Sequence, residues 1–156
     1  MTNHREQVLE QLVELAKSLP KYEILLCIPE IKETTATSVI DELGDIRRFK
    51  SAYQINVFIG IDLKHYESGD FLGQEHITKR GNPCARKILY KSIRNIASAS
   101  HTNPCHIADF YEKRKRQSQT TSTKPHTIAS IHRLIRTMYY LIMHNKLYDY
   151  TLAQSH

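Results

Sequence analysis

Apolar residues recur at helical spacing along most of the chain. In the first twenty residues they follow one another at steps of four, three and four: Val8, Leu12, Leu15 and Leu19. This spacing, with glutamates on the other faces, predicts an amphipathic helix. The apolar strip is narrow, as in a helix that pairs with another helix. We therefore expect a coiled-coil-like helix over residues 3–19, ended by Pro20.

A pair of short helices is predicted next. Residues 22–28 form a short apolar run, a tight turn follows at 29–32, and residues 34–43 carry apolar positions at helical spacing. Gly44 is placed to end the second helix. Two helices around a tight turn with exposed amides are typical of a helix-hairpin-helix unit, which holds a DNA phosphate. A hairpin used only for packing is an equal alternative, and Glu30 adds a negative charge at the turn.

The remaining helices are indicated by their capping residues. Ser51 and Gln54 have the spacing of a capping box, and Gly60 stops the helix that they open. The Asn82-Pro83 pair opens a helix that runs to about residue 100, and the Asn103-Pro104 pair repeats the signal. A third long helix spans roughly 125–144, after a polar loop at 117–124. Residues 61–81 show no helical period, and no alternating strand is evident. The fold class is therefore mainly α, with a central glycine-containing loop.

Charge divides the chain into two parts. There are 22 Lys and Arg against 16 Asp and Glu, which gives a net charge of +6. Residues 1–45 carry four basic and nine acidic side chains (−5), whereas residues 46–156 carry eighteen basic and seven acidic ones (+11). Such an asymmetry favours a polyanionic partner for the second part, and nucleic acid is the commonest. A solvated basic surface without a partner is the alternative.

The helix that starts at Pro83 concentrates these charges. Its apolar positions gather on one side of a helical wheel: Ala85, Ile88, Leu89, Ile93 and Ile96. Lys87, Lys91 and Arg94 lie on the opposite side at a spacing at which like charges repel, and an anionic partner would relieve the repulsion. Lys79 and Arg80 stand just before the helix. An ordinary solvated face explains the same pattern without a partner.

The central loop holds a candidate nucleophile. Ser68 precedes Gly69, upstream of Lys79 and Arg80. A serine in such a loop can attack a phosphodiester while cations stabilise the charge on the phosphate oxygens. Exposed loop serines are common, so this chemistry alone is a weak signal.

No metal site is predicted. His101, Cys105 and His106 lack the paired spacing of a zinc set. Loop carboxylates near Ser68 could bind a divalent ion, but a loop acid is usually only solvated. Three widely spaced cysteines are expected to be reduced thiols. No stretch is apolar enough for a signal peptide or a membrane span, so we expect a cytoplasmic protein with no membrane partner.

Several short motifs, taken together in their order and spacing, resemble the C-terminal domain of the insertion-sequence 110/116/902 transposases. The motifs are Ile28-Pro29-x-Ile31, Thr35-Ala36, Glu42-Leu43-Gly44-Asp45-Ile46, Phe49, Gly60, Ser68-Gly69, and Ile77-Thr78-Lys79-Arg80-Gly81-Asn82 with Arg86. The resemblance covers roughly residues 20–150. Departures occur at Glu30 and Lys32, where the family usually has glycines.

The resemblance implies a function and a division of the chain. Members of this family are DNA recombinases guided by a structured RNA, and a RuvC-like domain with acidic metal ligands is joined to the C-terminal domain by a coiled coil. By this resemblance Ser68 is the catalytic nucleophile, and Lys79, Arg80 and Arg86 position or neutralise the phosphate. Residues 1–19 would be the linker helix and residues 20–156 the transposase C-terminal helical domain.

Three hypotheses follow. In the first, the chain is a transposase catalytic domain that lacks the RuvC-like half, is a truncated or split product, and is inactive alone. It would itself bind no cofactor, since Mg²⁺ is expected only with that half. Its partners would be DNA and, as a candidate, a guide RNA. In the second, the chain is a noncatalytic DNA- or RNA-binding helical remnant that uses Lys87, Lys91 and Arg94. In the third, it is a helical interaction protein. Residues 3–19 are expected to form a homo-oligomer.

Overall fold

A computed structural model describes the backbone of residues 2–64, 67–68, 71–72 and 76–154, and the side chains of residues 3–62 and 77–154. Within these residues the chain is mainly α-helical, as predicted. The elements in chain order are α1 (Thr2–Lys17), α2 (Pro20–Leu26), α3 (Glu33–Leu43), a 3₁₀ turn η1 (Ile46–Arg48), α4 (Ala52–Ile59), β1 (Leu63–Lys64), β2 (Glu67–Ser68), β3 (Phe71–Leu72), β4 (His76–Ile77), α5 (Pro83–Ser98), α6 (His106–Gln117), α7 (Lys124–Met143) and α8 (Tyr150–Gln154).

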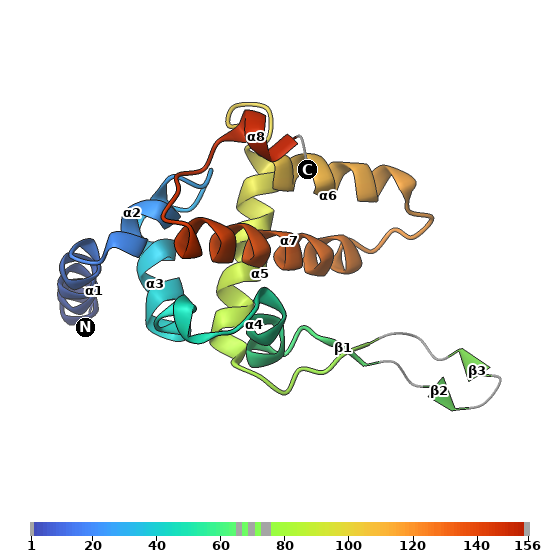
Figure 1. The fold of residues 1–156 in the computed structure, drawn as a ribbon, viewed down its shortest axis with the longest axis horizontal. Coiled ribbons are helices and arrows are strands. Elements are labelled where there is room, and N and C mark those ends of the chain that lie inside the picture. Colours follow the sequence, from blue (N-terminus) through green and yellow to red (C-terminus); the bar gives the residue numbers. More distant parts are fainter. Residues whose placement is uncertain (1, 65–66, 69–70, 73–75, 155–156) are drawn as a thin grey trace.

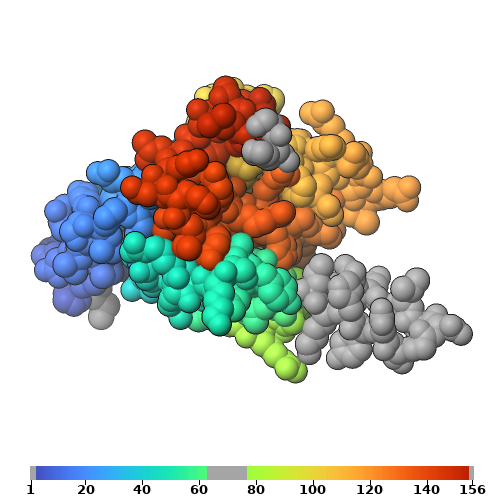
Figure 2. All heavy atoms as spheres, viewed as in Figure 1, coloured from blue at the N-terminus to red at the C-terminus, as the bar shows by residue number. Residues whose placement is uncertain are grey.

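Two long helices form the centre of the molecule. α7 crosses α5, α6 packs beside α7, and α1 lies at the far end with α2 and α3 (Figure 1). The predicted apolar side of α5 is buried at Ala85, Leu89, Ile93 and Ile96. It meets a buried strip on α7 that includes Ile131, Leu134 and Ile135. α4 and the second half of α7 lie side by side on the face that Figure 2 shows, in teal and orange-red.

Local capping explains the end of α3 and both ends of α4. Gly44 ends α3 with a φ of 64° and donates its N–H to the Ile40 carbonyl. The Ser51 hydroxyl accepts the Gln54 N–H at the start of α4, and Gly60 ends that helix in the left-handed conformation. These residues do what their sequence pattern predicted, because each contact is made within four residues of the cap.

The predicted helix start at Asn103-Pro104 is wrong by two residues. α6 begins at His106, with Cys105 at the N-cap position. The Asn103 side chain is used elsewhere, because its amide donates a hydrogen bond of 3.1 Å to a carboxylate oxygen of Glu30. Pro20 also differs from expectation, since it stands in the first turn of α2 while α1 has already ended at Lys17.

The hairpin of α2 and α3 is present, and its turn is strained. Glu30 has a φ of 64°, in the left-handed region that favours glycine. The carboxylate of Glu30 is fixed by Asn103, and the Ile31 N–H bonds back to the Ile28 carbonyl. Phosphate binding by this hairpin, which would make it a helix-hairpin-helix unit, stays a prediction.

The central segment contains short strands that the sequence pattern did not predict. β1 pairs antiparallel with β4, and β2 pairs antiparallel with β3. Each strand has two residues, which is too short for an alternating apolar pattern to appear. None of the helices in the described part of the chain has the length and apolar character that a membrane crossing requires.

Candidate nucleic-acid interface

The segment before α5 is held against the end of α4 by its backbone. Lys79 donates its N–H to the Gly60 carbonyl at 2.9 Å, and Asn82 donates to the Phe58 carbonyl at 3.0 Å. A Cβ added to Gly81 would lie 2.3 Å from the Phe58 carbonyl oxygen and 2.4 Å from the Gly60 nitrogen. Only a residue without a side chain fits there, so glycine fixes the course of residues 78–82.

Lys79 adopts an unusual backbone conformation in this segment. Its φ of 54° lies in the left-handed region, which costs about 1–3 kcal/mol in a residue other than glycine. The neighbouring Thr78 is tied to Asp62 through its N–H (3.1 Å) and through its hydroxyl (2.6 Å). These hydrogen bonds offset the backbone strain at Lys79. The side chain of Lys79 is exposed.

Asn82 joins three elements. Its side-chain oxygen accepts the N–H groups of Cys84 and Ala85, which caps α5 as predicted. Its amide nitrogen donates to Glu42 near the end of α3 at 2.6 Å. The start of α5 is therefore positioned by α3 as well as by α4.

Arg86, the next predicted phosphate contact, has a structural partner. Its guanidinium donates to the Ile59 carbonyl at 2.9 Å, at the last turn of α4. A cation there satisfies a free carbonyl and interacts favourably with the negative end of the helix dipole. The side chain is half-buried and also lines the groove described next.

A basic groove of about 650 Å³ lies between α5, the end of α6, the start of α7 and β4. We call it the basic groove and define it by its lining residues: Ile77, Lys79, Pro83, Arg86, Lys87, Tyr90, Arg114, Lys124, Pro125, Ile128, Ala129 and His132. Among the described residues, every charged residue that lines the basic groove is a lysine or an arginine. Four of them, Lys79, Lys87, Arg114 and Lys124, are exposed.

His132 adds a neutral side chain to this groove at neutral pH. Burial lowers the pKa of its half-buried imidazole, and the nearby Arg136 lowers it further, while the Ile61 carbonyl and Asp62 act in the opposite direction. The positive charge of the groove therefore comes from its lysines and arginines.

The structure brings together part of the predicted set. Lys79, Arg86 and Lys87 line the groove, whereas Arg80, Lys91 and Arg94 are exposed but lie outside it. Sequence reasoning missed Arg114 and Lys124 as site residues. The basic run at 112–116 was the available signal for Arg114, and it turns out to be the last part of α6.

Ser68 belongs to β2 by its backbone and pairs there with Phe71. Its side chain lies outside the described residues, as do Gly69, Asp70 and Gly73 altogether. The role predicted for the Ser68 hydroxyl therefore stays a prediction. In the part of the chain whose side chains are described, no group of three or more His, Cys, Asp or Glu could hold a metal ion.

A second hollow, of about 690 Å³, lies between α7 and the C-terminal residues. Among its lining residues, the two ring nitrogens of His106 contact the hydroxyls of Tyr148 (2.7 Å) and Thr137 (3.2 Å). Burial, with help from the nearby Arg133, lowers the pKa of His106 to about 4. Because both nitrogens are occupied, this histidine ties α6 to the C-terminal segment.

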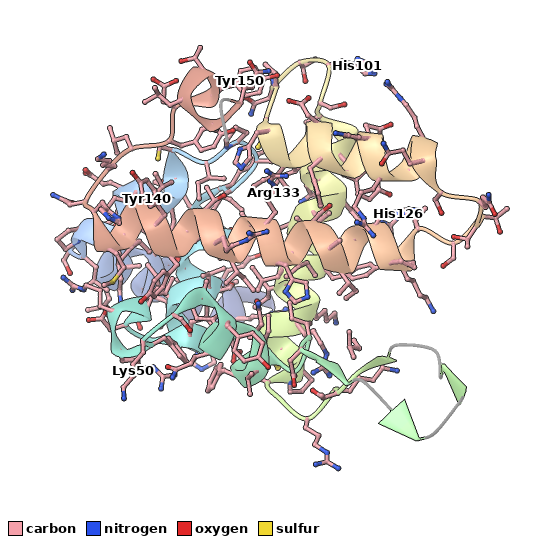
Figure 3. The ribbon with its side chains drawn as sticks, turned by 45° about the vertical axis from the view of Figure 1, so that its right-hand side comes forward. Lys50, His101, His126, Arg133, Tyr140 and Tyr150 are labelled. Atoms are coloured by element: carbon pink, nitrogen blue, oxygen red, sulfur yellow. The ribbon has the colours of Figure 1, made fainter. Side chains whose placement is uncertain are left out.

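Other contacts fasten the same segment. The Tyr150 hydroxyl donates to Asp109 on α6 at 2.9 Å, and the Tyr148 N–H donates to the Cys27 sulfur. Arg133 lies over the Phe110 ring, between α7 and α6 (Figure 3). The surroundings of this second hollow are therefore explained by packing of α8 onto the helical body.

Comparison with known proteins adds an independent line of evidence. Residues 22–112 match the family described as Transposase IS116/IS110/IS902. The chain is also 33% identical over 87 residues to the transposase for insertion sequence element IS1111A of Coxiella burnetii (strain RSA 493 / Nine Mile phase I). That match covers 56% of this chain and 24% of the relative, so the matched part spans about a quarter of that protein's length. Arg114, Lys124 and His132 of the basic groove lie beyond the family match.

Proposed function

Because the chain belongs to the IS116/IS110/IS902 family of transposases, we propose that it acts in DNA transposition and that the basic groove holds a nucleic-acid strand there. The observation that carries this proposal is the convergence of Lys79, Arg86 and Lys87 with Arg114 and Lys124 in one groove. Cations from a loop and three helices are gathered although like charges repel. A bound row of phosphates removes that repulsion and releases counterions.

Ser68 is the nucleophile in this proposal. Its hydroxyl attacks a DNA phosphodiester, so that a bond between serine Oγ and phosphorus replaces one P–O bond of the strand. The hydroxyl loses its proton, and the oxygen of the released strand end takes one up. The covalent link keeps the bond energy for rejoining. Support comes from the family membership and from the place of Ser68 in the chain between β1 and β4, since β4 contains the groove residue Ile77 and is followed by Lys79.

No step of this proposal is assigned to a metal ion. In this proposal Mg²⁺ belongs to a RuvC-like part of the transposase. A guide RNA is included as a second ligand of the basic surface, on which the exposed Arg80, Lys91 and Arg94 extend the charge beyond the groove.

α1 serves as a pairing helix in the same proposal, with residues 20–156 as the nucleic-acid-binding unit. Ala16 of α1 is buried against the body, but Val8 and Leu15 of the same helix are exposed, as is Leu19 just beyond its end. Leu15 has 69% of its surface accessible, which leaves one apolar side of the helix uncovered. A second α1 helix would cover this side.

Nucleic-acid binding is tested with the double variant Lys87→Ala/Lys124→Ala. Its affinity for DNA should fall for every sequence, and the slope of log affinity against log salt should become shallower by about two units. Lys50→Ala is the matched control, since Lys50 is an exposed lysine on the η1–α4 side, away from the groove (Figure 3). Equal affinities and slopes in the double variant and the wild type would reject the groove as the binding site.

The nucleophile is tested by trapping a covalent adduct. The full chain, supplied with a RuvC-like partner domain and a DNA substrate, should form an adduct that resists denaturation. Ser68→Ala should abolish it, and Ser98→Ala, at an exposed serine of α5, should not. Salt-dependent binding without any adduct would favour the alternative, a noncatalytic nucleic-acid-binding remnant of a transposase.

A further inference from the structure

The basic groove combines two kinds of surface. Its half-buried lining residues include the apolar or aromatic side chains Ile77, Tyr90, Ile128 and Ala129. Four of its five charged residues, Lys79, Lys87, Arg114 and Lys124, are exposed, whereas the fifth, Arg86, is half-buried like the apolar residues. We call the half-buried apolar and aromatic residues the apolar floor of the groove and its exposed cations the cationic rim.

A DNA duplex makes poor use of such a floor. The faces of the bases are stacked inside a duplex, which presents phosphates, sugars and only the edges of the bases to a protein. Phosphates would reach the lysines of the rim, but the apolar floor would stay empty. An unpaired nucleotide, in contrast, carries a base with an apolar π-face and a phosphate on each side, and so matches both surfaces.

Tyr90 is the residue on the floor that fits a base. It lies on the same face of α5 as Arg86 and Lys87, one turn further along the helix, and lines the groove with them. Aromatic rings bind unpaired bases of any sequence by stacking. The groove volume of about 650 Å³ is within the usual range of pockets that enclose a small ligand, roughly 300–1,000 Å³.

We infer that the basic groove binds an unpaired nucleotide, with its base stacked on Tyr90 and its flanking phosphates on Lys87 and Lys124. This inference rests on the proposed nucleic-acid binding and specifies its substrate class. The nucleotide is either in a single strand or extruded from a duplex. Its sugar type is left open by the stacking argument, since DNA and RNA bases offer the same π-face.

The first experiment compares strands with duplexes. Fluorescence anisotropy of the full chain is measured with a labelled 12-nucleotide single strand and with a blunt duplex of the same sequence, in DNA and in RNA form. We expect the single strands to bind at least about tenfold more tightly at equal salt. The ratio between the two single strands assigns the source, DNA or RNA.

The second experiment separates stacking from charge. Tyr90→Leu keeps an apolar side chain but removes the ring, and should weaken single-strand binding by about five- to a hundredfold without changing the salt slope. Tyr90→Phe, which keeps the ring, should bind like the wild type. Circular dichroism melting establishes that each variant is folded.

A direct readout uses the wild-type chain alone. A strand with a single 5-iodouracil should, on irradiation, cross-link to Tyr90, identified by mass spectrometry. Equal binding of strand and duplex, with no effect of Tyr90→Leu and no cross-link at Tyr90, would overturn the inference but leave the proposed binding intact if the Lys87→Ala/Lys124→Ala double variant still loses affinity. Insensitivity of that double variant as well would overturn both.

Discussion

Gly81 lies with its backbone directly against that of Gly60. A Cβ on Gly60 would be 2.7 Å from the Gly81 nitrogen, and a Cβ on Gly81 would be 2.4 Å from the Gly60 nitrogen. Neither residue has space for a side chain, so the two backbones cross at a distance that only glycine permits. This crossing joins the end of α4 to the segment that carries Lys79 and Arg80, and so sets one edge of the basic groove.

Gly81→Ala should therefore destabilise the chain and disturb the groove. The nearest atoms to the new methyl group belong to the backbone of Phe58, Ile59 and Gly60, which cannot rotate aside. We expect a loss of at least about 2 kcal/mol of unfolding free energy, measured by urea denaturation. Folded Gly81→Ala should also bind DNA more weakly, because residues 78–82, which carry Lys79 and Arg80, must move.

Gly44→Ala is the control for this variant. A Cβ on Gly44 would meet nothing closer than 3.8 Å, so the loss of unfolding free energy in Gly44→Ala comes only from the backbone strain at a φ of 64°. This variant should lose stability but keep the DNA affinity of the wild type. If Gly81→Ala were as stable as the wild type, the close crossing of the two glycines would be refuted.

The helix ends that could be predicted from the sequence are those with local causes. Gly44, Ser51, Gly60 and Asn82 each act on backbone groups within four positions, so short motifs were enough to place them. The amphipathic pattern of α5 was likewise sufficient to predict its buried side.

Features that depend on distant residues could not be predicted in this way. The Asn103-Pro104 pair predicts a helix start, but the amide of Asn103 donates a hydrogen bond to Glu30, 73 positions away. Arg114 and Lys124 reach the groove only because α6 and α7 pack against each other and against α5. A single sequence has no pattern that reports such packing, whereas Lys79, Arg86 and Lys87 are neighbours in the chain and were found together.

The Glu30–Asn103 contact predicts a measurable coupling. Asn103→Ala should cost about 1 kcal/mol in the wild type, because it removes a half-buried hydrogen bond to a carboxylate. In a Glu30→Gly background the same change should cost little. Glu30→Gly alone should be nearly neutral, since the relief of its φ of 64° offsets the lost bond. A double-mutant cycle by urea denaturation measures the coupling, and additive effects would exclude the contact.

His106 predicts a loss of stability in acid. Burial lowers its pKa to about 4 in the folded chain, against 6.5 for a free histidine. Between pH 6.5 and 4, His106 is therefore protonated in the unfolded chain but remains neutral in the folded chain. Above pH 6.5 the titration of His106 does not change the free energy of unfolding. As the pH falls from 6.5 to 4, the free energy of unfolding decreases progressively. After allowance for its partial exposure, we expect about 1–2 kcal/mol at pH 4.

His106→Gln provides the comparison for this effect. Glutamine does not titrate but can still bond to the Tyr148 hydroxyl. The difference in unfolding free energy between the wild type and this variant, measured from pH 7 to pH 4, should shift in favour of the variant. His132, whose pKa is also lowered, is present in both chains, so its effect on the unfolding free energy cancels in the difference. A difference that does not change with pH would show that His106 titrates normally.

Asn82 and Glu42 offer a test of how α5 is positioned. Asn82→Asp keeps the oxygen that caps α5 but replaces the amide, which donates to Glu42 at 2.6 Å, with a second carboxylate. Two carboxylates at this distance repel, so the variant should lose about 1–3 kcal/mol at pH 7. Adding Glu42→Gln should restore most of this loss, because a glutamine amide can donate to the new aspartate. Since the cap is intact in both variants, a failure of the double variant to recover stability would mean that Asn82 acts on α5 alone and that α3 does not hold the start of the helix.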